Sequence, residues 1–356
     1  MITVEELSLP TDVYDITVED NHNFYCDDIL VHNCQEIALI TSGYENVSEL
    51  YSNSLDTDGE VALCFLASIV VTAFDIFSEQ AEDIYYNACK FVDNTIERCE
   101  YPFPNIEQKS KARRNIGIGL TDVAHWMTKN GYKYDTEEGR NAIHRLTERH
   151  SYLLHKASVK LSRERGRCDW YNKTKYADGW LPIDTYNKEI DAHHTQELLQ
   201  DWETLRKDVL EYGVRFSVHE AMMPVESSSV FTNSTNGLYP VRSLTMYKKS
   251  RKGPVYFSAP GADDYEYQYA WDINNLDLIK MYAIVQKFTG QSISSDVYVD
   301  YRKDSSPPIS GFIKEILLAH KLGMKTFYYM NSNTDTGAHE EQQSQQDIEG
   351  CEECKL

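Results

Sequence analysis

Several features that would assign this chain to a broad class at once are missing. It has 356 residues, and no apolar run approaches the roughly 18 residues that a membrane-spanning helix needs. Its first ten residues include Glu5 and Glu6 and no basic cluster, so we expect no signal peptide. Hydrophobic residues make up 41% and charged residues 26%, which is typical of a soluble globular protein. A cytoplasmic protein with no membrane segment is therefore the expectation.

Basic residues and cysteines are also scarce. The 35 Lys and Arg residues face 56 Asp and Glu residues, a formal net charge of −21. This balance argues against a nucleic-acid-binding protein, whose affinity comes from cations on phosphates, although one local site can still bind a nucleotide. Eight cysteines are too few for a disulfide scaffold. Each cysteine is therefore expected to be either a buried thiol or a reactive group. The sequence contains no internal repeat that we can detect.

The chain divides into three parts by composition. Residues 1–33 predict two short strands, Val13–Val18 and Ile29–Val31, around a polar turn at 19–23, and are too few to form a core alone. Residues 34–330 alternate between apolar strands and amphipathic helices, which predicts an α/β fold. From about Asn331 the sequence is polar and acidic, so residues 331–356 are expected to form a disordered tail.

The predicted elements of the middle part follow from its apolar periodicity. We expect strands at 62–66, 116–120, 292–299 and 325–330. We expect helices at 81–99, 121–129, 141–165, 276–288 and 310–322. The helix at 81–99 should bury one face, made of Ile84, Ala88, Phe91, Val92 and Ile96.

The end of the first part contains residues that suit protein splicing. Asn33 can cyclise onto its own carbonyl and cut the bond to Cys34, with His32 polarising that carbonyl and His22 as a second acid or base. With Asp15 at an acidic position, this pattern resembles the C-terminal motif of inteins. Cys34 would then capture the upstream segment as a thioester. The competing interpretation is a β-rich extension with a chance His-Asn-Cys sequence.

The N-terminal half of an intein begins with a nucleophile and is much longer than 33 residues. No such segment is present in this chain. The resemblance therefore implies a split intein that works in trans, and an upstream partner chain that carries the N-terminal intein fragment.

The rest of the chain carries many motifs in a fixed order. They are Cys-Gln-Glu-Ile-Ala-Leu (34–39), Gly-Glu-Val-Ala-Leu-Cys (59–64), Arg-Arg-Asn-Ile-Gly-Ile-Gly (113–119), Leu-Pro-Ile-Asp-Thr-Tyr (181–186), Met-Pro-Val-Glu-Ser-Ser-Ser (223–229), Asn-Ser-Thr-Asn-Gly (233–237), Lys-Thr-Phe-Tyr-Tyr (325–329) and a terminal Cys-x-x-Cys. In this order they resemble the C-terminal half of a class I ribonucleotide reductase large (alpha) subunit. The resemblance covers about nine tenths of the chain and implies the second half of a ten-stranded α/β barrel.

The resemblance also implies roles for single residues. Cys34 would be the thiyl radical that abstracts the 3′-hydrogen of the ribose. Glu36, two residues along the same strand, would take the 3′-hydroxyl proton. Cys64 would belong to the dithiol that reduces the substrate, with its partner on the missing upstream half. The competing interpretations are a splicing nucleophile only for Cys34, and a plain buried thiol for Cys64.

Tyr328 and Tyr329 would carry the radical inward, since a tyrosine can pass an electron hole on to a thiol. Among 25 tyrosines, a chance Tyr-Tyr pair is expected, and Tyr85–Tyr86 is one. Only the surrounding Lys-Thr-Phe-Tyr-Tyr motif selects 328–329. The radical would come from the metal centre of a small partner subunit, and we expect no metal or cofactor on this chain.

The segment that starts at Pro224 is a candidate for binding the substrate's diphosphate. A helix beginning there would offer free backbone N–H groups to an anion. The candidate residues are Val225, Glu226, Ser227 and Ser228. The competing interpretation is a simple helix cap.

The terminal cysteines, Cys351 and Cys354, suit a shuttle that reduces the buried disulfide and is recharged by thioredoxin or glutaredoxin. Zinc binding would need a second pair of ligands, and none is nearby. The remaining cysteines have no motif support and are expected to be structural: Cys26, Cys89, Cys99 and Cys168.

Together these features predict a ribonucleoside-diphosphate reductase that becomes active only after joining to its upstream half. The main rival is a splicing module attached to an inactive reductase-like segment, against which the intact Cys34, Glu36, Cys64 and tyrosine pair argue. A thiol–disulfide carrier would not need some 300 ordered residues. A glycyl-radical reductase is disfavoured because the chain ends in a dithiol tail.

Overall fold

The computed structural model describes residues 23–26, 29–32, 35–51, 58–250 and 253–334. The chain separates into two compact units, Met1–Asn33 and Cys34–Leu356. The positions of these units relative to one another are not determined, so each is considered by itself.

The first unit contains an antiparallel hairpin. Its strands are β1 (Asn23–Cys26) and β2 (Ile29–His32), and Phe24 pairs with Val31. The strand predicted at Ile29–Val31 is thereby confirmed, whereas Asn23 belongs to β1 and not to the predicted turn. The strand predicted at Val13–Val18 lies outside the described residues.

The second unit is built on a parallel three-stranded sheet. Its order is β3 (Phe65–Val70), β4 (Asn115–Thr121), β5 (Val218–Glu220). Parallel neighbours need long crossover connections, and helices supply them here. The predicted mixed α/β fold is confirmed. β3 begins three residues later than predicted because its backbone pairs in register with β4, from Phe65 opposite Ile116 to Val70 opposite Thr121.

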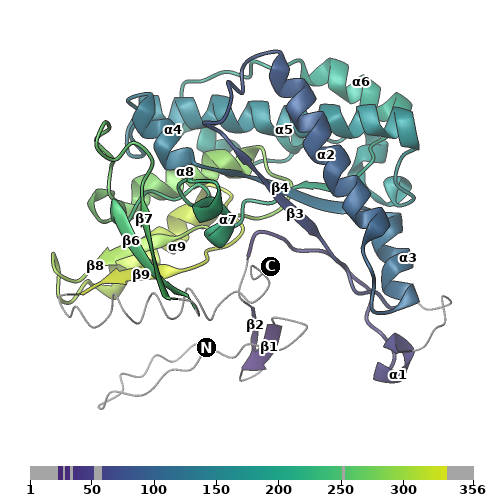
Figure 1. Ribbon diagram of the computed structural model, residues 1–356, viewed down its shortest axis with the longest axis horizontal. Helices are drawn as coiled ribbons and strands as arrows, with labels where there is room; N and C mark the ends of the chain where they lie inside the picture. The colour runs from purple at the N-terminus through teal and green to yellow at the C-terminus, as the bar shows by residue number, and fades with distance from the viewer. Residues whose placement is uncertain (1–22, 27–28, 33–34, 52–57, 251–252, 335–356) are drawn as a thin grey trace. The chain divides into compact units, whose positions relative to one another are not determined.

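Helices pack along this sheet (Figure 1), where α2 and α5 run side by side. The α-helices are α1 (Val47–Leu50), α2 (Gln80–Arg98), α3 (Pro104–Arg113), α4 (Val123–Lys129), α5 (Glu137–Arg165), α6 (Trp202–Tyr212), α7 (Glu226–Phe231), α8 (Asn275–Lys287) and α9 (Ile309–Lys321). The largest hydrophobic core includes fully buried residues of β4, α2, α5 and α8. Short 3-10 helices fill much of the stretch between α5 and α6.

A second parallel pair extends the strand–helix–strand pattern. β8 (Val297–Asp300) and β9 (Met330–Asn333) pair in parallel, with α9 between them in the chain. An isolated parallel bridge between Met222 and Ile293 connects the residues after β5 to those before β8. This succession of parallel strands is compatible with half of an α/β barrel, and the closed ten-stranded barrel stays a prediction. The antiparallel hairpin of β6 (Thr245–Ser250) and β7 (Gly253–Ser258) was not predicted from the sequence.

The longer predicted helices are confirmed with small shifts at their ends. α5 begins at Glu137, four residues before the predicted start, because the Thr136 hydroxyl caps it by accepting from the Gly139 N–H at 3.1 Å. It ends before Gly166, whose φ of +86° is readily accessible only to glycine. α8 and α9 each begin one residue before their predicted starts.

The buried face of α2 differs from the predicted one. Phe91 is 72% exposed, and Ile84 and Ala88 are only partly buried, while Tyr85 and Cys89 are completely buried. The helix is rotated so that the row through Ala81, Tyr85 and Cys89 faces α5 and the sheet. The Tyr85 hydroxyl bonds the His150 ring of α5 at 2.7 Å, which accounts for a tyrosine on the inner face.

The strands near the end of the second unit are also displaced from their predictions. Residues 292–296 and 325–329 form no strand, and β8 and β9 begin only at Val297 and Met330. Side-chain hydroxyls in 292–295 bond other segments in place of a regular ladder.

The predicted tail starts too early. Asn331 lies in β9 and is 8% exposed, because its polar side chain is bonded on both sides rather than solvated. Residues 335–356, the rest of the predicted tail, lie outside the described residues.

Candidate functional site

The loop that follows Cys34 is held by serine hydroxyls. Glu36 is 3% exposed, and its carboxylate accepts a short hydrogen bond from the Ser294 hydroxyl. That hydroxyl also accepts from the Gln35 N–H at 3.0 Å, and the Ser292 hydroxyl bonds the Gln35 carbonyl. Glu36 is therefore not in a strand, contrary to the prediction. The backbone N–H and carbonyl of the neighbouring Gln35 bond serine hydroxyls and not a neighbouring strand. Cys34 itself lies outside the described residues.

Cys64 sits immediately before β3 as a free thiol. Burial, and next the charge of Glu36, raise the pKa of Cys64 well above its ordinary value. The group is therefore a protonated thiol at neutral pH and a weak nucleophile. Gly117 of β4 permits this packing, because a Cβ there would lie 2.6 Å from the Ala221 Cβ and 3.3 Å from the Cys64 Sγ.

Three further cysteines, Cys89, Cys99 and Cys168, differ in how far they are exposed. Cys89 and Cys168 are buried, as expected for structural thiols. Cys99 is exposed at the end of α2, so it has no packing role of that kind. The terminal cysteines Cys351 and Cys354 lie outside the described residues, as do Asp15, His22 and Asn33.

Tyr328 and Tyr329 form a close ring pair, with centroids 3.8 Å apart and ring planes tilted by 38°. The Tyr328 N–H donates to the Ser295 carbonyl at 2.9 Å, and Tyr329 is 44% exposed. Ser295 follows Ser294, which bonds Glu36. Adjacent serines thus hold the Glu36 loop and the tyrosine pair, so the structure brings these predicted residues into one neighbourhood.

The predicted phosphate segment is arranged differently from expectation. α7 begins at Glu226, and the backbone N–H groups of Val225 and Glu226 donate to the Asn236 side-chain oxygen at 2.7 and 3.1 Å. The N–H of Ser228 donates to the Val225 carbonyl at 3.1 Å. These groups are therefore not free for an anion, because a side chain from the following turn and a local backbone bond occupy them. Ser227 and Ser228 are exposed.

Glu226 completes this cap. Its carboxylate accepts from the Asn236 side-chain N–H at 2.7 Å, and its φ is +44°. A non-glycine residue in this region costs about 1–2 kcal/mol, so the Asn236 contacts must hold a strained turn.

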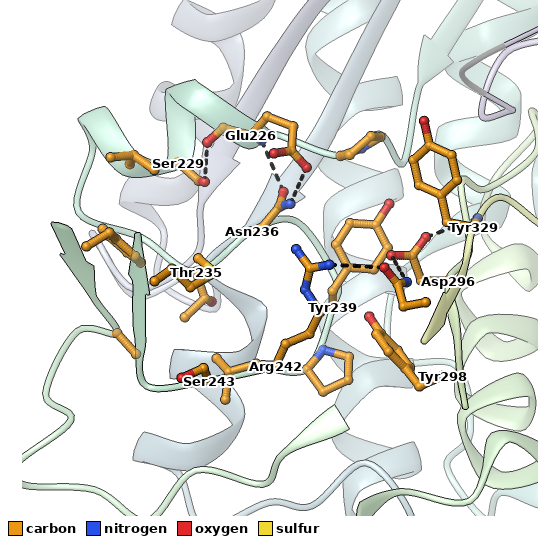
Figure 2. A pocket seen from close by; sticks show the side chains of 18 of the residues that line it. Glu226, Ser229, Thr235, Asn236, Tyr239, Arg242, Ser243, Asp296, Tyr298 and Tyr329 are labelled. Atoms are coloured by element: carbon orange, nitrogen blue, oxygen red, sulfur yellow. Dashed lines mark hydrogen bonds between the residues drawn. The ribbon is translucent and has the colours of Figure 1, made fainter. Parts of the chain in front are cut away.

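A pocket joins this cap to the tyrosine pair (Figure 2). Its lining includes the predicted Glu226, Tyr328 and Tyr329. It also includes polar residues that the sequence analysis missed: Thr235, Asn236, Tyr239, Arg242, Asp296, Tyr298 and Asn331. Thr235 and Asn236 belong to the motif at 233–237, which could have pointed to them, whereas the rest come from segments with no motif.

Asn331 links two charged side chains in the pocket. Its oxygen accepts from the Arg242 guanidinium at 3.1 Å, and its N–H donates to the Asp296 carboxylate at 2.9 Å. Asp296 also accepts from the Tyr329 N–H at 3.3 Å. Burial raises the pKa of Asp296 to about 7, against the lowering effects of Asn331 and Arg242. A carboxyl that changes charge near neutral pH therefore lies beside the tyrosine pair.

Among the described residues, no group of three or more His, Cys, Asp or Glu side chains is arranged to hold a metal ion. None of the helices in this part of the chain is long and apolar enough to cross a membrane.

Comparison with known proteins identifies relatives of this chain. The curated relatives include the ribonucleoside-diphosphate reductase subunit alpha of Haemophilus influenzae, 36% identical over 323 residues that cover 89% of this chain and 41% of the relative. The ribonucleoside-diphosphate reductase 1 subunit alpha of Salmonella typhimurium is 39% identical over 271 residues, which cover 72% of this chain and 35% of the relative. The ribonucleoside-diphosphate reductase subunit alpha of Enterobacteria phage T4 is 33% identical over 331 residues, which cover 91% of this chain and 42% of the relative.

This chain therefore spans about two fifths of the length of such relatives. The family model described as "Ribonucleotide reductase, barrel domain" matches residues 10–264 and 258–330. Taken with the parallel strands and the clustered Glu36, Cys64 and tyrosine pair, this match shows that the chain belongs to the ribonucleotide reductase barrel-domain family.

Proposed function

We propose that this chain is the C-terminal half of a ribonucleoside-diphosphate reductase large subunit, active once joined to its upstream half. The observation that carries the proposal is the serine segment 292–295, which holds the Glu36 loop and the Tyr328 backbone side by side. The relatives bear the name of this enzyme and are more than twice as long as the match. The remaining length of these relatives corresponds to the proposed upstream half.

The chemistry is assigned to the clustered residues. A radical passes through Tyr329 and Tyr328 to Cys34, whose thiyl sulfur takes the 3′-hydrogen atom of a ribonucleoside diphosphate. Glu36 accepts the 3′-hydroxyl proton. Cys64 and a cysteine of the upstream half are oxidised to a disulfide as the 2′-hydroxyl leaves as water, and the 3′-hydrogen returns from Cys34.

The protonated state of Cys64 supports this role. A thiol can give both a proton and reducing equivalents, whereas a thiolate gives only the latter. The raised pKa of Cys64, caused by burial and by Glu36, keeps the proton on the sulfur.

Two protein partners belong to the proposal. A small subunit supplies the radical from its metal centre. The exposed apolar face of α9, the helix that precedes the tyrosine segment in the chain, is suited to bind a protein. That face consists of Ile309, Phe312, Ile313, Ile316 and Leu317. The tail cysteines, Cys351 and Cys354, then pass electrons from thioredoxin or glutaredoxin to the buried disulfide.

The first unit is proposed to be the C-terminal fragment of a split intein. The β1–β2 hairpin ends at His32, directly before Asn33 and Cys34. Asn33 cyclisation, assisted by His32 and His22, releases the second unit with Cys34 as its first residue. The reductase family match begins inside this unit, at residue 10, so a segment retained in the mature enzyme is the competing interpretation.

A reconstitution experiment tests the reductase proposal. The chain is combined with its upstream half and small subunit, and conversion of cytidine diphosphate to the deoxynucleotide is measured with dithiothreitol. Cys64→Ser should remove turnover, while the exposed Cys99→Ser control keeps it. Ligation without any turnover would favour a splicing module attached to an inactive segment. Full turnover by Cys64→Ser would remove that cysteine from the mechanism.

A further inference from the structure

A groove lined by basic side chains crosses the second unit and shares no lining residue with the pocket of Figure 2. Two cavities form it, of about 720 and about 310 Å³, and both are lined by Lys175, Trp180 and Gly290. We call it the lysine groove and define it by its five basic residues: Arg113, Lys173, Lys175, Lys287 and Lys325.

The lysine groove is positive in a chain whose formal net charge is −21. Its lining contains one carboxylate, Glu220, which is only 1% exposed. Arg113 pairs with Glu60, and Lys287 pairs with Asp191 at 2.8 Å. The groove therefore keeps its positive charge only through its remaining lysines.

Those lysines are Lys173, Lys175 and Lys325. All three are exposed, and none forms an ion pair with a carboxylate of the described residues. Within the described part of the chain, the Lys325 ammonium donates only to the backbone carbonyls of Gly290 and Gln291, at 2.7 and 2.9 Å. A ligand with several carboxylates would supply the missing partners.

One feature of the wall suits a peptide rather than a bare ion. Trp170 and Trp180 line it, and the Arg113 guanidinium and the Lys173 ammonium lie 3.7 and 4.4 Å from the Trp170 ring centroid. The side chains of a peptide can pack on indole rings while its carboxylates pair with the neighbouring cations.

One end of the groove lies against the Cys64 segment. Asn115 lines the groove, and its side-chain N–H donates to the carbonyl of Leu63, the residue before Cys64, at 3.0 Å. The Arg113 guanidinium donates to the Ile40 carbonyl at 2.7 Å, four residues after Glu36. Hydrogen bonds thus join the groove wall to the two segments that carry Cys64 and Glu36.

We propose that the lysine groove docks the acidic C-terminal segment of this chain, residues 335–356, and so delivers Cys351 and Cys354 to Cys64. This inference rests on the proposed shuttle. The basic residue of the segment is Lys355, and its acidic residues are Asp335, Glu340, Glu341, Asp347, Glu349, Glu352 and Glu353. In extended form, the twenty residues from Asp335 to Cys354 reach roughly 65 Å.

The exchange that docking promotes is balanced within the enzyme. A thiolate of the tail pair attacks the disulfide that contains Cys64, and the second tail cysteine resolves the mixed disulfide. The tail pair is oxidised to a disulfide, and the buried pair gains two electrons and two protons. Thioredoxin or glutaredoxin then reduces the tail.

Zero-length carbodiimide cross-linking tests the docking without any need for turnover. The reagent joins a lysine to a carboxylate in direct contact, and the products are mapped by mass spectrometry on the full chain. We expect acids of 335–356 to be joined to Lys173, Lys175 or Lys325, and the products to disappear in 1 M salt. Cross-links that favour Lys129 and Lys207, which are exposed outside the groove, would overturn the proposal.

Charge reversal tests the consequence in the joined enzyme. The double variant Lys173→Glu/Lys175→Glu should lose about tenfold in thioredoxin-driven turnover and keep its dithiothreitol-driven turnover, because a small dithiol needs no docking. The matched control, Lys129→Glu/Lys207→Glu, should lose neither. Adding Glu352→Lys/Glu353→Lys to the groove variant should restore the thioredoxin-driven rate.

The outcomes separate this inference from the proposed function. Absence of dithiothreitol-driven turnover in the parent enzyme would contradict the reductase proposal, and the cross-linking result would still decide the docking. Unchanged thioredoxin-driven turnover in the groove variant, or equal loss with both reductants, would contradict docking of the tail.

Discussion

Replacement of Asp93 by asparagine should destabilise the second unit more than any surface substitution. Asp93 is a completely buried residue of α2, and its carboxylate bonds Arg114 at 2.8 Å, Arg165 at 2.7 Å and Arg215 at 3.0 Å. Burial alone would raise the pKa of Asp93, but hydrogen bonds and charges from these arginines lower it overall. The ionised carboxylate is thus the form that the fold stabilises.

The magnitude follows from the exposure of each partner. Breaking a buried ion pair by removing one charge costs about 3–5 kcal/mol, because the other charge is left without compensation. The Arg215 side chain is 9% exposed, whereas that of Arg165 is 28% exposed and can be hydrated. Arg114 keeps a second partner in Glu97. An asparagine side chain would preserve the shape, so we expect Asp93→Asn to lose about 3 kcal/mol, a large part of the ~5–15 kcal/mol typical of a domain.

Urea unfolding of the full chain, followed by circular dichroism, measures this difference. Glu203→Gln is the matched control, since the Glu203 side chain is 72% exposed and its pair with Arg206 should contribute at most about 0.5 kcal/mol. Because the folded pKa of Asp93 is lowered, its contribution should be full above the ordinary pKa of about 3.9 and fade as the pH falls below that value. A loss under about 1 kcal/mol at pH 7 would contradict the loss of about 3 kcal/mol expected from an uncompensated buried charge.

Three further predictions concern function. Asn33→Ala should prevent release of the second unit in the presence of the upstream half, seen by mass spectrometry as residues 1–33 still attached, because alanine cannot cyclise. Tyr328→Phe and Tyr329→Phe should each abolish turnover while substrate binding is kept, since a phenyl ring cannot be oxidised at the available potential; substantial turnover would remove that tyrosine from the path. Cys351→Ser and Cys354→Ser should lose thioredoxin-driven but not dithiothreitol-driven turnover, and equal loss with both would contradict a shuttle.

The sequence predicted the α/β class, the main helices and several site residues because these depend on local signals. Amphipathic periodicity and a terminal Gly166 mark α5, and short motifs mark Glu36, Cys64 and the tyrosine pair. Strand limits were less predictable, since the start of β3 is decided by pairing with β4 some fifty residues away.

The missed parts of the site depend on contacts between distant segments. Asn331 is polar and follows the tyrosine motif, so composition suggested a tail, yet Arg242 and Asp296 bond it from 89 and 35 residues away. Asn236 caps α7 from the following turn, which periodicity within 224–229 does not reveal. The lysine groove likewise joins α3, α8 and loops that no single motif connects.

The most direct test of the account is the amount of deoxynucleotide formed by the joined, prereduced enzyme with its small subunit and no added reductant. Each dithiol supplies the two electrons for one product, so the parent draws on the Cys64 pair and on the tail pair. We expect the Cys351→Ser/Cys354→Ser variant to form about half the parental product, and the Cys64→Ser variant to form none. Product from Cys64→Ser, or no product from the parent, would contradict the claim that this chain carries the reducing half of a ribonucleotide reductase.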